Sequence, residues 1–271
     1  MTENYNRPPE GDWLGTKFLR FERRGSIAIV TVDRPERRNA LTPAMYFGIR
    51  YAVSHVQSDP DLAGLLITGT GDVFIPGGDL GGDTEGGWQV PPSIGLDLLP
   101  FESIRQATKP VVCAVNGLCQ GGGLMIAMLS DVTVAATHAT FRAPELFRGI
   151  ADTSYAQILP RQIGPALARD MLLTGRTATA DEALAWGLVA RLAEPEALLA
   201  EALEVVASIA RTAPDARNEV KRVFDRYYGA YDRIAMQHSL SGPEPVEGFM
   251  AFKERRNPNW VASDLRTEGR L

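Results

Sequence analysis

The sequence predicts an α/β fold in which short buried strands alternate with helices. Residues Ile27–Val32 form a nearly continuous apolar run rich in β-branched side chains, which is typical of a strand buried on both faces. Thr42 and Pro43 then supply a helix N-cap and a proline at the first helical position, and this helix runs to about Val56. The next apolar run, Leu65–Thr68, is a second strand. Because strand, helix and strand follow in this order, we expect a layered α/β core.

The same alternation continues through the middle of the chain. The patterns predict, in order, a helix over Leu98–Gln106, a strand over Val111–Val115, a helix over Leu124–Leu129 and a strand over Val132–Ala135. Between the first strands and these elements, Gly81–Pro92 holds four glycines and two prolines and is expected to be a loop.

The last part of the chain is expected to be helical. Pro165 opens a helix that Gly175 closes. From Pro195 onward the pattern has the period of amphipathic helices. One face of the first of these carries Leu199, Leu203, Val206 and Ile209/Ala210.

Composition excludes several classes of protein. The chain has 271 residues, of which 45% are hydrophobic and 23% charged, as in ordinary globular proteins of one or two domains. Its 28 basic and 33 acidic residues give a net charge of −5, which argues against a dedicated nucleic-acid partner. No apolar run predicts a membrane span, and residues 1–15 are expected to be a flexible arm without a signal core.

Cysteine usage points to a reducing compartment. Cys113 and Cys119 are the two cysteines of the chain, and they complete neither a disulfide framework nor a zinc site. We therefore expect a cytoplasmic protein that holds no metal ion.

Two glycine-rich turns are the most informative feature of the sequence. Phe74–Leu80 and Asn116–Gly123 each place glycines where the chain leaves a strand and approaches a helix. Glycine lets backbone N–H groups face a ligand without a side chain in the way. Two such groups that converge on one oxygen make an oxyanion hole, which stabilises negative charge on a thioester carbonyl.

These turns belong to an ordered series of motifs through which the chain resembles the crotonase family, the enoyl-CoA hydratases and isomerases. The resemblance covers about residues 18–258 and implies a spiral of ββα turns in residues 16–194. It also implies a helical region in residues 195–271 that builds a homotrimer or a dimer of trimers. The motifs are Asp33-Arg34-Pro35, Asn39-Ala40-Leu41, Phe74–Leu80, Asn116–Gly123, Ser130-Asp131, Phe141–Glu145, Thr174-Gly175-Arg176, Ala180–Ala183, Gly187-Leu188-Val189 and Ala251–Arg256.

The resemblance implies an acyl-CoA thioester as ligand, with coenzyme A as part of the substrate and no separate cofactor. It assigns the two oxyanion-hole N–H groups to Gly78 and Gly122, and the catalytic acid or base to Glu145. A carboxylate beside a bound acyl chain would be desolvated, which raises its pKa towards the working pH. The loop over residues 81–92, with Trp88, is expected to shape the acyl pocket.

The chain departs from the typical hydratases of the family at Met125, where they carry a second glutamate that helps to hold the attacking water. Methionine cannot hold or deprotonate water, so we expect Met125 only to contact substrate. Asp152 resembles an extra aspartate of dienoyl-CoA isomerases, with one residue fewer in between. It is expected to be either a second proton carrier or a helix N-cap.

For the coenzyme A portion, the resemblance implies contacts from Arg37, Arg38 and Ala40, and from backbone at Gly78, Asp79 and Leu80. Arg34 joins the first two in a basic cluster suited to phosphate groups. Phe252 and Arg255 match positions that in relatives reach the nucleotide of a neighbouring subunit.

Three functions follow from this set of residues. The leading expectation is β,γ- to α,β-enoyl-CoA isomerisation by Glu145, with the enolate held by Gly78 and Gly122. The alternative is an enoyl-CoA hydratase of fatty-acid β-oxidation, in which Asp152 helps to place the water. A third alternative is an acyl-CoA-binding protein without catalytic activity.

Overall fold

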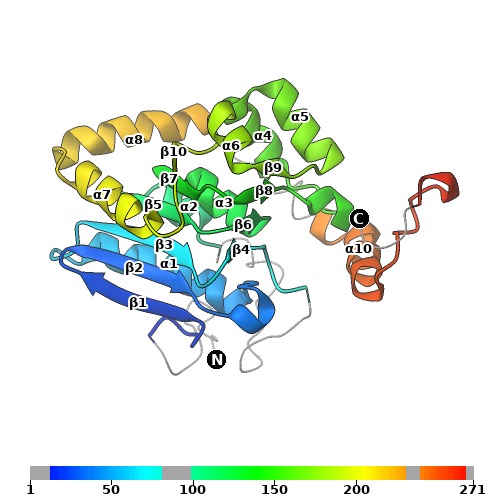
Figure 1. Cartoon of the computed structure of the whole chain (residues 1–271), viewed down its shortest axis with the longest axis horizontal. Helices are drawn as coiled ribbons and strands as arrows, with labels where there is room; N and C mark the ends of the chain where they lie inside the picture. Colours follow the sequence, from blue (N-terminus) through cyan, green and yellow to red (C-terminus); the bar gives the residue numbers. More distant parts are fainter. Residues whose placement is uncertain (1–12, 81–98, 230–238, 267–271) are drawn as a thin grey trace.

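Two β-sheets form the centre of the molecule (Figure 1). The computed structural model describes residues 13–80, 99–229 and 239–266. The predicted loop over residues 81–92, with Trp88, therefore lies outside the described residues, as does the predicted arm up to residue 12. Leu14, which the sequence assigned to the arm, is fully buried in the core.

The larger sheet has six strands in the order β1-β2-β3-β5-β7-β10. Strand β1 pairs antiparallel with β2, and the other neighbours are parallel. The smaller sheet has four strands in the order β4-β6-β8-β9. The strands are β1 (Leu19–Arg24), β2 (Ile27–Val32), β3 (Gly64–Gly69), β4 (Val73–Ile75), β5 (Val111–Val115), β6 (Leu118–Gln120), β7 (Val132–Ala136), β8 (Thr140–Arg142), β9 (Ala178–Thr179) and β10 (Arg191–Ala193).

Consecutive strands divide between the two sheets. In the pairs β3/β4, β5/β6 and β7/β8, the first strand joins the large sheet and the second joins the small one. A helix then returns the chain to the large sheet, which makes the parallel pairing possible. This arrangement is the ββα spiral that the sequence predicted.

Helix boundaries follow the predicted capping residues. The Thr42 side chain accepts a hydrogen bond from Met45 N–H at 3.2 Å, and α1 begins at Pro43. Gly175 closes α5 in the left-handed conformation. The helices are α1 (Pro43–Ser58), α2 (Phe101–Arg105), α3 (Gly122–Leu129), α4 (Thr153–Ile163), α5 (Pro165–Thr174), α6 (Ala180–Trp186), α7 (Leu198–Ala210), α8 (Pro214–Tyr228) and α10 (Pro243–Glu254), with single 3-10 turns η1 (Pro35–Arg37), η4 (Glu145–Arg148) and η5 (Ser263–Leu265).

The central strands of the large sheet, β2, β3, β5 and β7, are buried on both faces, which explains their nearly continuous apolar sequences. Helices α1 and α3 and the small sheet cover one face, and α7 covers the other. The α7 contact is rotated by about one residue from the predicted face. The buried residues of α7 are Leu198, Ala202, Val205 and Val206. Of the predicted face, Val206 is confirmed as buried, while Leu199, Leu203, Ile209 and Ala210 are partly buried at its margin. Because Ala202 contributes little to a hydrophobic pattern, the sequence did not reveal this close contact.

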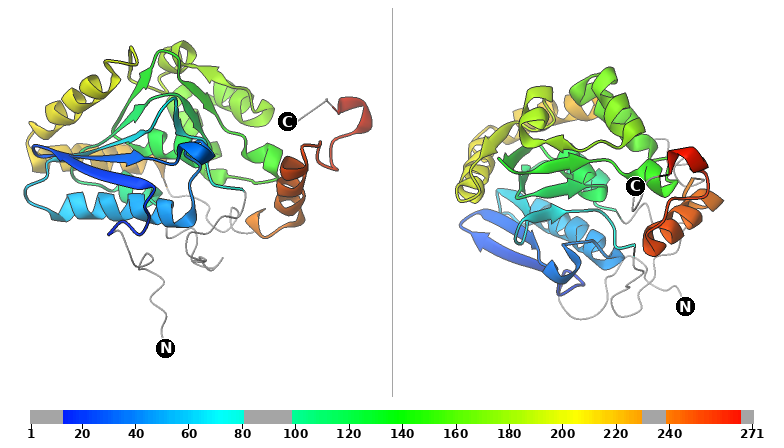
Figure 2. Two further views of the ribbon diagram at one scale, coloured as in Figure 1. Left: turned by 60° about the horizontal axis from the view of Figure 1, so that its bottom comes forward. Right: turned by 45° about the vertical axis from the view of Figure 1, so that its right-hand side comes forward.

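Helix α10 lies at the opposite end of the molecule from α7, and both views in Figure 2 show it beside the segment that carries η4. Two glycines allow this close approach. A methyl group on Gly149 would lie 2.5 Å from the Glu244 carbonyl carbon, and one on Gly248 would lie 2.5 Å from the Arg148 carbonyl group. The C-terminal helix is thus fixed against the segment that follows β8. Within the described residues, no helix has the length and apolar character needed to cross a membrane.

Candidate active site

A cavity of about 740 Å³ lies where the two glycine turns, η4 and α10 meet. It brings together most of the residues that the sequence assigned to the site, from segments far apart in the chain. The predicted residues that line it are Arg37, Arg38, Ala40, Gly78, Asp79, Leu80, Gly122, Glu145, Asp152 and Phe252. Met125 and Arg255 do not line it.

The two glycine turns are in contact with each other. A methyl group on Gly77, whose φ is +112°, would lie 3.8 Å from the Gly122 nitrogen. One on Gly121, whose φ is +52°, would lie 3.3 Å from the Gly77 Cα atom and 3.2 Å from Glu145 Oε1. Both glycines adopt positive φ values that other residues rarely reach. The carboxylate therefore lies directly beside the paired turns.

Backbone N–H groups are available in both turns. Gly122 is the first residue of α3, and Met125 N–H donates to Gly121 C=O at 3.1 Å in the first turn of the helix. The earlier N–H groups lack partners within the helix and carry the positive end of its dipole. Gly78 and Leu41 form a β-bridge, in which Leu41 N–H donates to Gly77 C=O and Asp79 N–H donates to Leu41 C=O. The N–H group of Gly78 itself is not used in this bridge.

Glu145 begins η4, directly after Pro144. Its Oε2 atom is buried, with no hydrogen-bond partner among the described residues. Burial, together with the nearby charge of Asp152, raises the pKa of Glu145 to about 8, although Arg148 and Arg142 act in the opposite direction. A carboxyl group with such a pKa can both accept and donate a proton near neutral pH.

Asp152 has a structural role as well as a place in the cavity. Its Oδ1 accepts a hydrogen bond from Ser154 N–H at 3.0 Å and caps α4. It lines the same cavity as Glu145, and burial raises its pKa. The N-cap alternative is therefore confirmed, and the proximity to Glu145 leaves a second role open.

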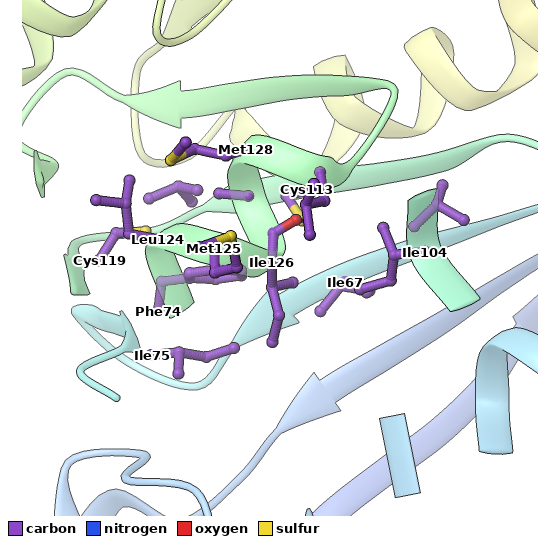
Figure 3. Packing of buried hydrophobic residues seen from close by; sticks show 14 of the residues in the cluster. Ile67, Phe74, Ile75, Ile104, Cys113, Cys119, Leu124, Met125, Ile126 and Met128 are labelled. Carbon is purple, nitrogen blue, oxygen red and sulfur yellow. The ribbon is translucent and has the colours of Figure 1, made fainter. Parts of the chain in front are cut away.

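Met125 lies in the hydrophobic core. It is 1% exposed, and Figure 3 shows it among Phe74, Leu124 and Ile126. Its neighbours are apolar, so an uncharged side chain such as methionine fits this position of α3. Among the described residues, no carboxylate from α3 lines the cavity, and the acids that do line it are Asp79, Glu145 and Asp152.

The three arginines of the predicted basic cluster have different environments. Arg37 and Arg38 are exposed at the cavity rim and form no ion pair within the described residues. Arg34 is instead fully buried, and its Nη1 contacts Asp79 Oδ2 at 2.7 Å and donates to Ala40 C=O at 2.9 Å. The expectation that Arg34 contacts phosphate is wrong, because Asp79 holds its guanidinium inside the protein.

Phe252 reaches the cavity from α10 of the same chain. The Arg148 guanidinium lies 4.2 Å from the centre of its ring, a cation–π contact that joins α10 to η4. Arg255 caps the end of α10 in a left-handed conformation with φ of 58°, is exposed, and does not line the cavity.

Two tyrosines at the site were not predicted. The Tyr155 hydroxyl, from α4, donates to Gly121 C=O and fixes the second glycine turn. Tyr46, from α1, lines the cavity beside both turns. No sequence motif marks either residue, because only the packing of α1 and α4 against the turns brings them there.

Comparison with known proteins agrees with this geometry. A family model described as enoyl-CoA hydratase/isomerase matches residues 22–263. The chain belongs to the enoyl-CoA hydratase/isomerase family. It is therefore a crotonase-family enzyme, and the alternative of a binding protein without catalytic activity is set aside.

Relatives in the family are similar over nearly their whole length. A carnitinyl-CoA dehydratase of Salmonella arizonae is 34% identical over 90% of this chain and 98% of its own. A mevalonyl-coenzyme A hydratase of Aspergillus fumigatus is 33% identical over 88% and 93%.

Solved structures share the fold. An enoyl-CoA hydratase/isomerase from Pseudoalteromonas atlantica superimposes with a TM-score of 0.80 at 29% identity, over 90% of this chain and 100% of its own. A monofunctional enoyl-CoA isomerase from M. smegmatis gives a TM-score of 0.68 at 28% identity, over 82% and 98%. Hydratases and isomerases of the family thus share this architecture.

Proposed function

We propose that this enzyme moves a proton along an enoyl-CoA thioester and converts a β,γ double bond into an α,β double bond. The observation that carries the proposal is Glu145. Its carboxyl group has one buried oxygen, a pKa of about 8 and a place beside the two glycine turns, and the α3 position where typical hydratases carry a second glutamate is an apolar methionine. One carboxyl group is sufficient for this reaction.

The reaction needs no net change in the enzyme. The Glu145 carboxylate takes a proton from the α carbon, and the electron pair of the broken C–H bond forms a dienolate with its charge on the thioester oxygen. The N–H groups of Gly78 and Gly122 stabilise that charge. The Glu145 carboxylic acid then returns the proton at the γ carbon, which restores the carboxylate and leaves the double bond between the α and β carbons.

Asp152 tunes this proton carrier. Its negative charge raises the pKa of Glu145, which brings the carboxyl group closer to the pH at which it exchanges protons readily. Because Asp152 also caps α4, the tuning charge is held in a fixed position.

The acyl end of the substrate has a separate space. A second cavity of about 190 Å³ shares Glu145 and Asp152 with the large one, and aliphatic side chains such as Ile150, Leu172 and Leu173 line it. Apolar cavities of about 150 Å³ accept a benzene-sized guest. We therefore expect an apolar acyl group of short or moderate size, with the coenzyme A portion in the larger cavity.

The test is a turnover assay on paired β,γ- and α,β-enoyl-CoA substrates of several chain lengths. It follows both double-bond migration and 3-hydroxyacyl-CoA formation. We expect migration by the native enzyme, reduced about 10²–10⁴-fold in Glu145→Gln. Glu201→Gln, which changes an exposed carboxylate on α7, is the matched control and should retain full activity. Full migration by Glu145→Gln would contradict the proposal.

Hydration or dehydration is the second candidate. Two observations favour it: relatives are named as a carnitinyl-CoA dehydratase and a mevalonyl-coenzyme A hydratase, and Asp152 lines the cavity together with Glu145. In this reaction Glu145 and Asp152 together would hold and deprotonate the water. It predicts 3-hydroxyacyl-CoA as the product, and loss of that product in both Glu145→Gln and Asp152→Asn.

We also propose that the enzyme is a homotrimer or a dimer of trimers. Helix α8 carries an exposed apolar stripe of Val220, Val223, Phe224 and Tyr227, spaced as one helical face. Such a stripe suits an interface between copies of this chain. Light scattering of Val223→Glu/Phe224→Glu should show monomers, whereas an unchanged mass would place the interface elsewhere.

A further inference from the structure

The Tyr46 hydroxyl lies where the two glycine turns meet. A methyl group on Gly78 would lie 3.7 Å from this hydroxyl oxygen. A methyl group on Gly122 would overlap the hydroxyl and lie 2.9 Å from the Tyr46 Cζ atom. The phenol therefore contacts both residues whose N–H groups are proposed to bind the thioester oxygen, and it lines the same cavity as Glu145.

Tyr46 is held in this position by its own helix and by a neighbouring ring. It lies in the first turn of α1, where its N–H donates to Thr42 C=O at 3.1 Å. Phe101 packs edge-on against the ring, with ring centres 6.4 Å apart and planes at 83°. The described residues supply no acceptor for the hydroxyl, so its O–H bond is free to point at a ligand.

The phenol stays protonated at neutral pH and can donate a hydrogen bond. Burial raises the pKa of Tyr46, and the charges of Glu145 and Asp152 raise it further. The hydroxyl therefore keeps its proton even when both carboxyl groups are ionised. A neutral O–H group can stabilise developing negative charge by donating a hydrogen bond, without transferring its proton.

We propose that the Tyr46 hydroxyl is a third donor to the thioester oxygen, alongside the N–H groups of Gly78 and Gly122. The inference shares with the proposed function only the acyl-CoA ligand, and it holds for isomerisation and hydration alike. A third donor strengthens its hydrogen bond as charge moves onto the oxygen, so its main effect is on the rate of the chemical step.

The experiment compares Tyr46→Phe with Tyr51→Phe. Tyr51 lies on the same helix, is 42% exposed and stacks on Phe47 away from the cavity lining, which makes it a matched control. The probe is butyryl-CoA labelled with ¹³C at the carbonyl, a saturated thioester that cannot react. Its carbonyl stretch in the infrared moves to lower frequency when donors polarise the bond.

In the native enzyme we expect this band to shift down on binding. Tyr46→Phe should lose part of the shift and lower kcat about 10–100-fold with little change in KM, while Tyr51→Phe changes neither. Replacing Tyr46 by 3-fluorotyrosine, a more acidic phenol of nearly the same shape, should increase the shift. A purely structural role for Tyr46 would not produce this increase.

A band that is the same in the native enzyme and Tyr46→Phe, or one that does not move on binding to the native enzyme, would overturn the inference. Failure of the proposed function is distinguishable from this. Absence of double-bond migration, together with a carbonyl shift that depends on Tyr46, would reject the isomerase and retain the third donor. Normal double-bond migration, together with a carbonyl band that is unchanged in Tyr46→Phe, would retain the isomerase and reject the third donor.

Discussion

The rim and the inner end of the cavity both carry charged side chains, but in opposite environments. At the rim, Arg37 and Arg38 are exposed to water. At the inner end, Glu145 has a buried oxygen without a hydrogen bond from the described residues, and its pKa is raised to about 8. Exposed charges attract a ligand weakly, whereas a desolvated carboxyl group becomes able to exchange protons near neutral pH. The exposed arginines at the rim are thus suited to attracting a ligand, and the carboxyl group at the inner end is suited to exchanging a proton.

A buried pair lies next to the rim and completes the comparison. Arg34 and Asp79 are both removed from water, but each compensates the other at 2.7 Å. The two carboxyl groups therefore differ in their partners: Asp79 has a guanidinium group at 2.7 Å, whereas Glu145 Oε2 has no hydrogen-bond partner among the described residues.

The largest expected effect comes from breaking this pair. Arg34→Met should lower the free energy of unfolding by about 3–5 kcal/mol, because it leaves Asp79 buried without its charge partner. Urea denaturation measures the change. Arg37→Met, at the exposed rim, is the control and should change stability by less than about 0.5 kcal/mol. If both variants lost the same free energy of unfolding, the buried Arg34 would contribute no more to stability than the exposed Arg37.

The next effect concerns Glu145 and pH. The pKa of its carboxyl group is about 8 in the folded protein, against 4.5 for an ordinary glutamate, so the folded state favours the protonated form. The stability it contributes is fully present below about pH 4.5 and is lost as the pH rises through about 8. Glu145→Gln should therefore be more stable than the native enzyme at pH 9, by a few kilocalories per mole, and similar to it at pH 4.

Unfolding curves of both proteins across this pH range provide the measurement. Glu201→Gln serves again as the exposed control and should follow the native curve throughout. If the Glu145→Gln and native curves also ran parallel, the carboxyl group would not be desolvated in the folded state.

The smallest effect is expected at the rim. Arg37→Ala or Arg38→Ala should raise KM for acyl-CoA about two- to fivefold and leave kcat unchanged, because an exposed charge contributes up to about 1 kcal/mol. The increase should shrink at high ionic strength as salt screens the charges. Steady-state kinetics at low and high salt measure it. A fall in kcat instead would mean that the rim takes part in the chemistry.

Much of the fold could be predicted because its signals are local. The strand Ile27–Val32 and the helix that starts after Thr42 depend on short apolar runs and capping residues, and the structure has them as predicted. The small sheet could not be found this way. Its strands contain two or three residues, too few to show a period, and they form only where the larger sheet positions them.

In the site, too, residues within sequence motifs could be predicted, whereas residues placed by distant partners could not. The glycine turns and Glu145 stand in motifs, so their positions in the cavity could be predicted from the sequence. Tyr46 and the burial of Arg34 depend on partners distant in the chain, Gly122 for the tyrosine and Asp79 for the arginine. No pattern around residue 34 distinguishes it from its exposed neighbours at residues 37 and 38.

The contact between α10 and η4 also sets an order of events during synthesis. Chains fold from their N-terminal parts as they leave the ribosome. Phe249 and Phe252 complete the cavity from a helix made about a hundred residues after Glu145. We therefore expect both sheets to assemble before α10 is made, and the cavity to be complete only once α10 packs against η4. Activity should depend on that docking step.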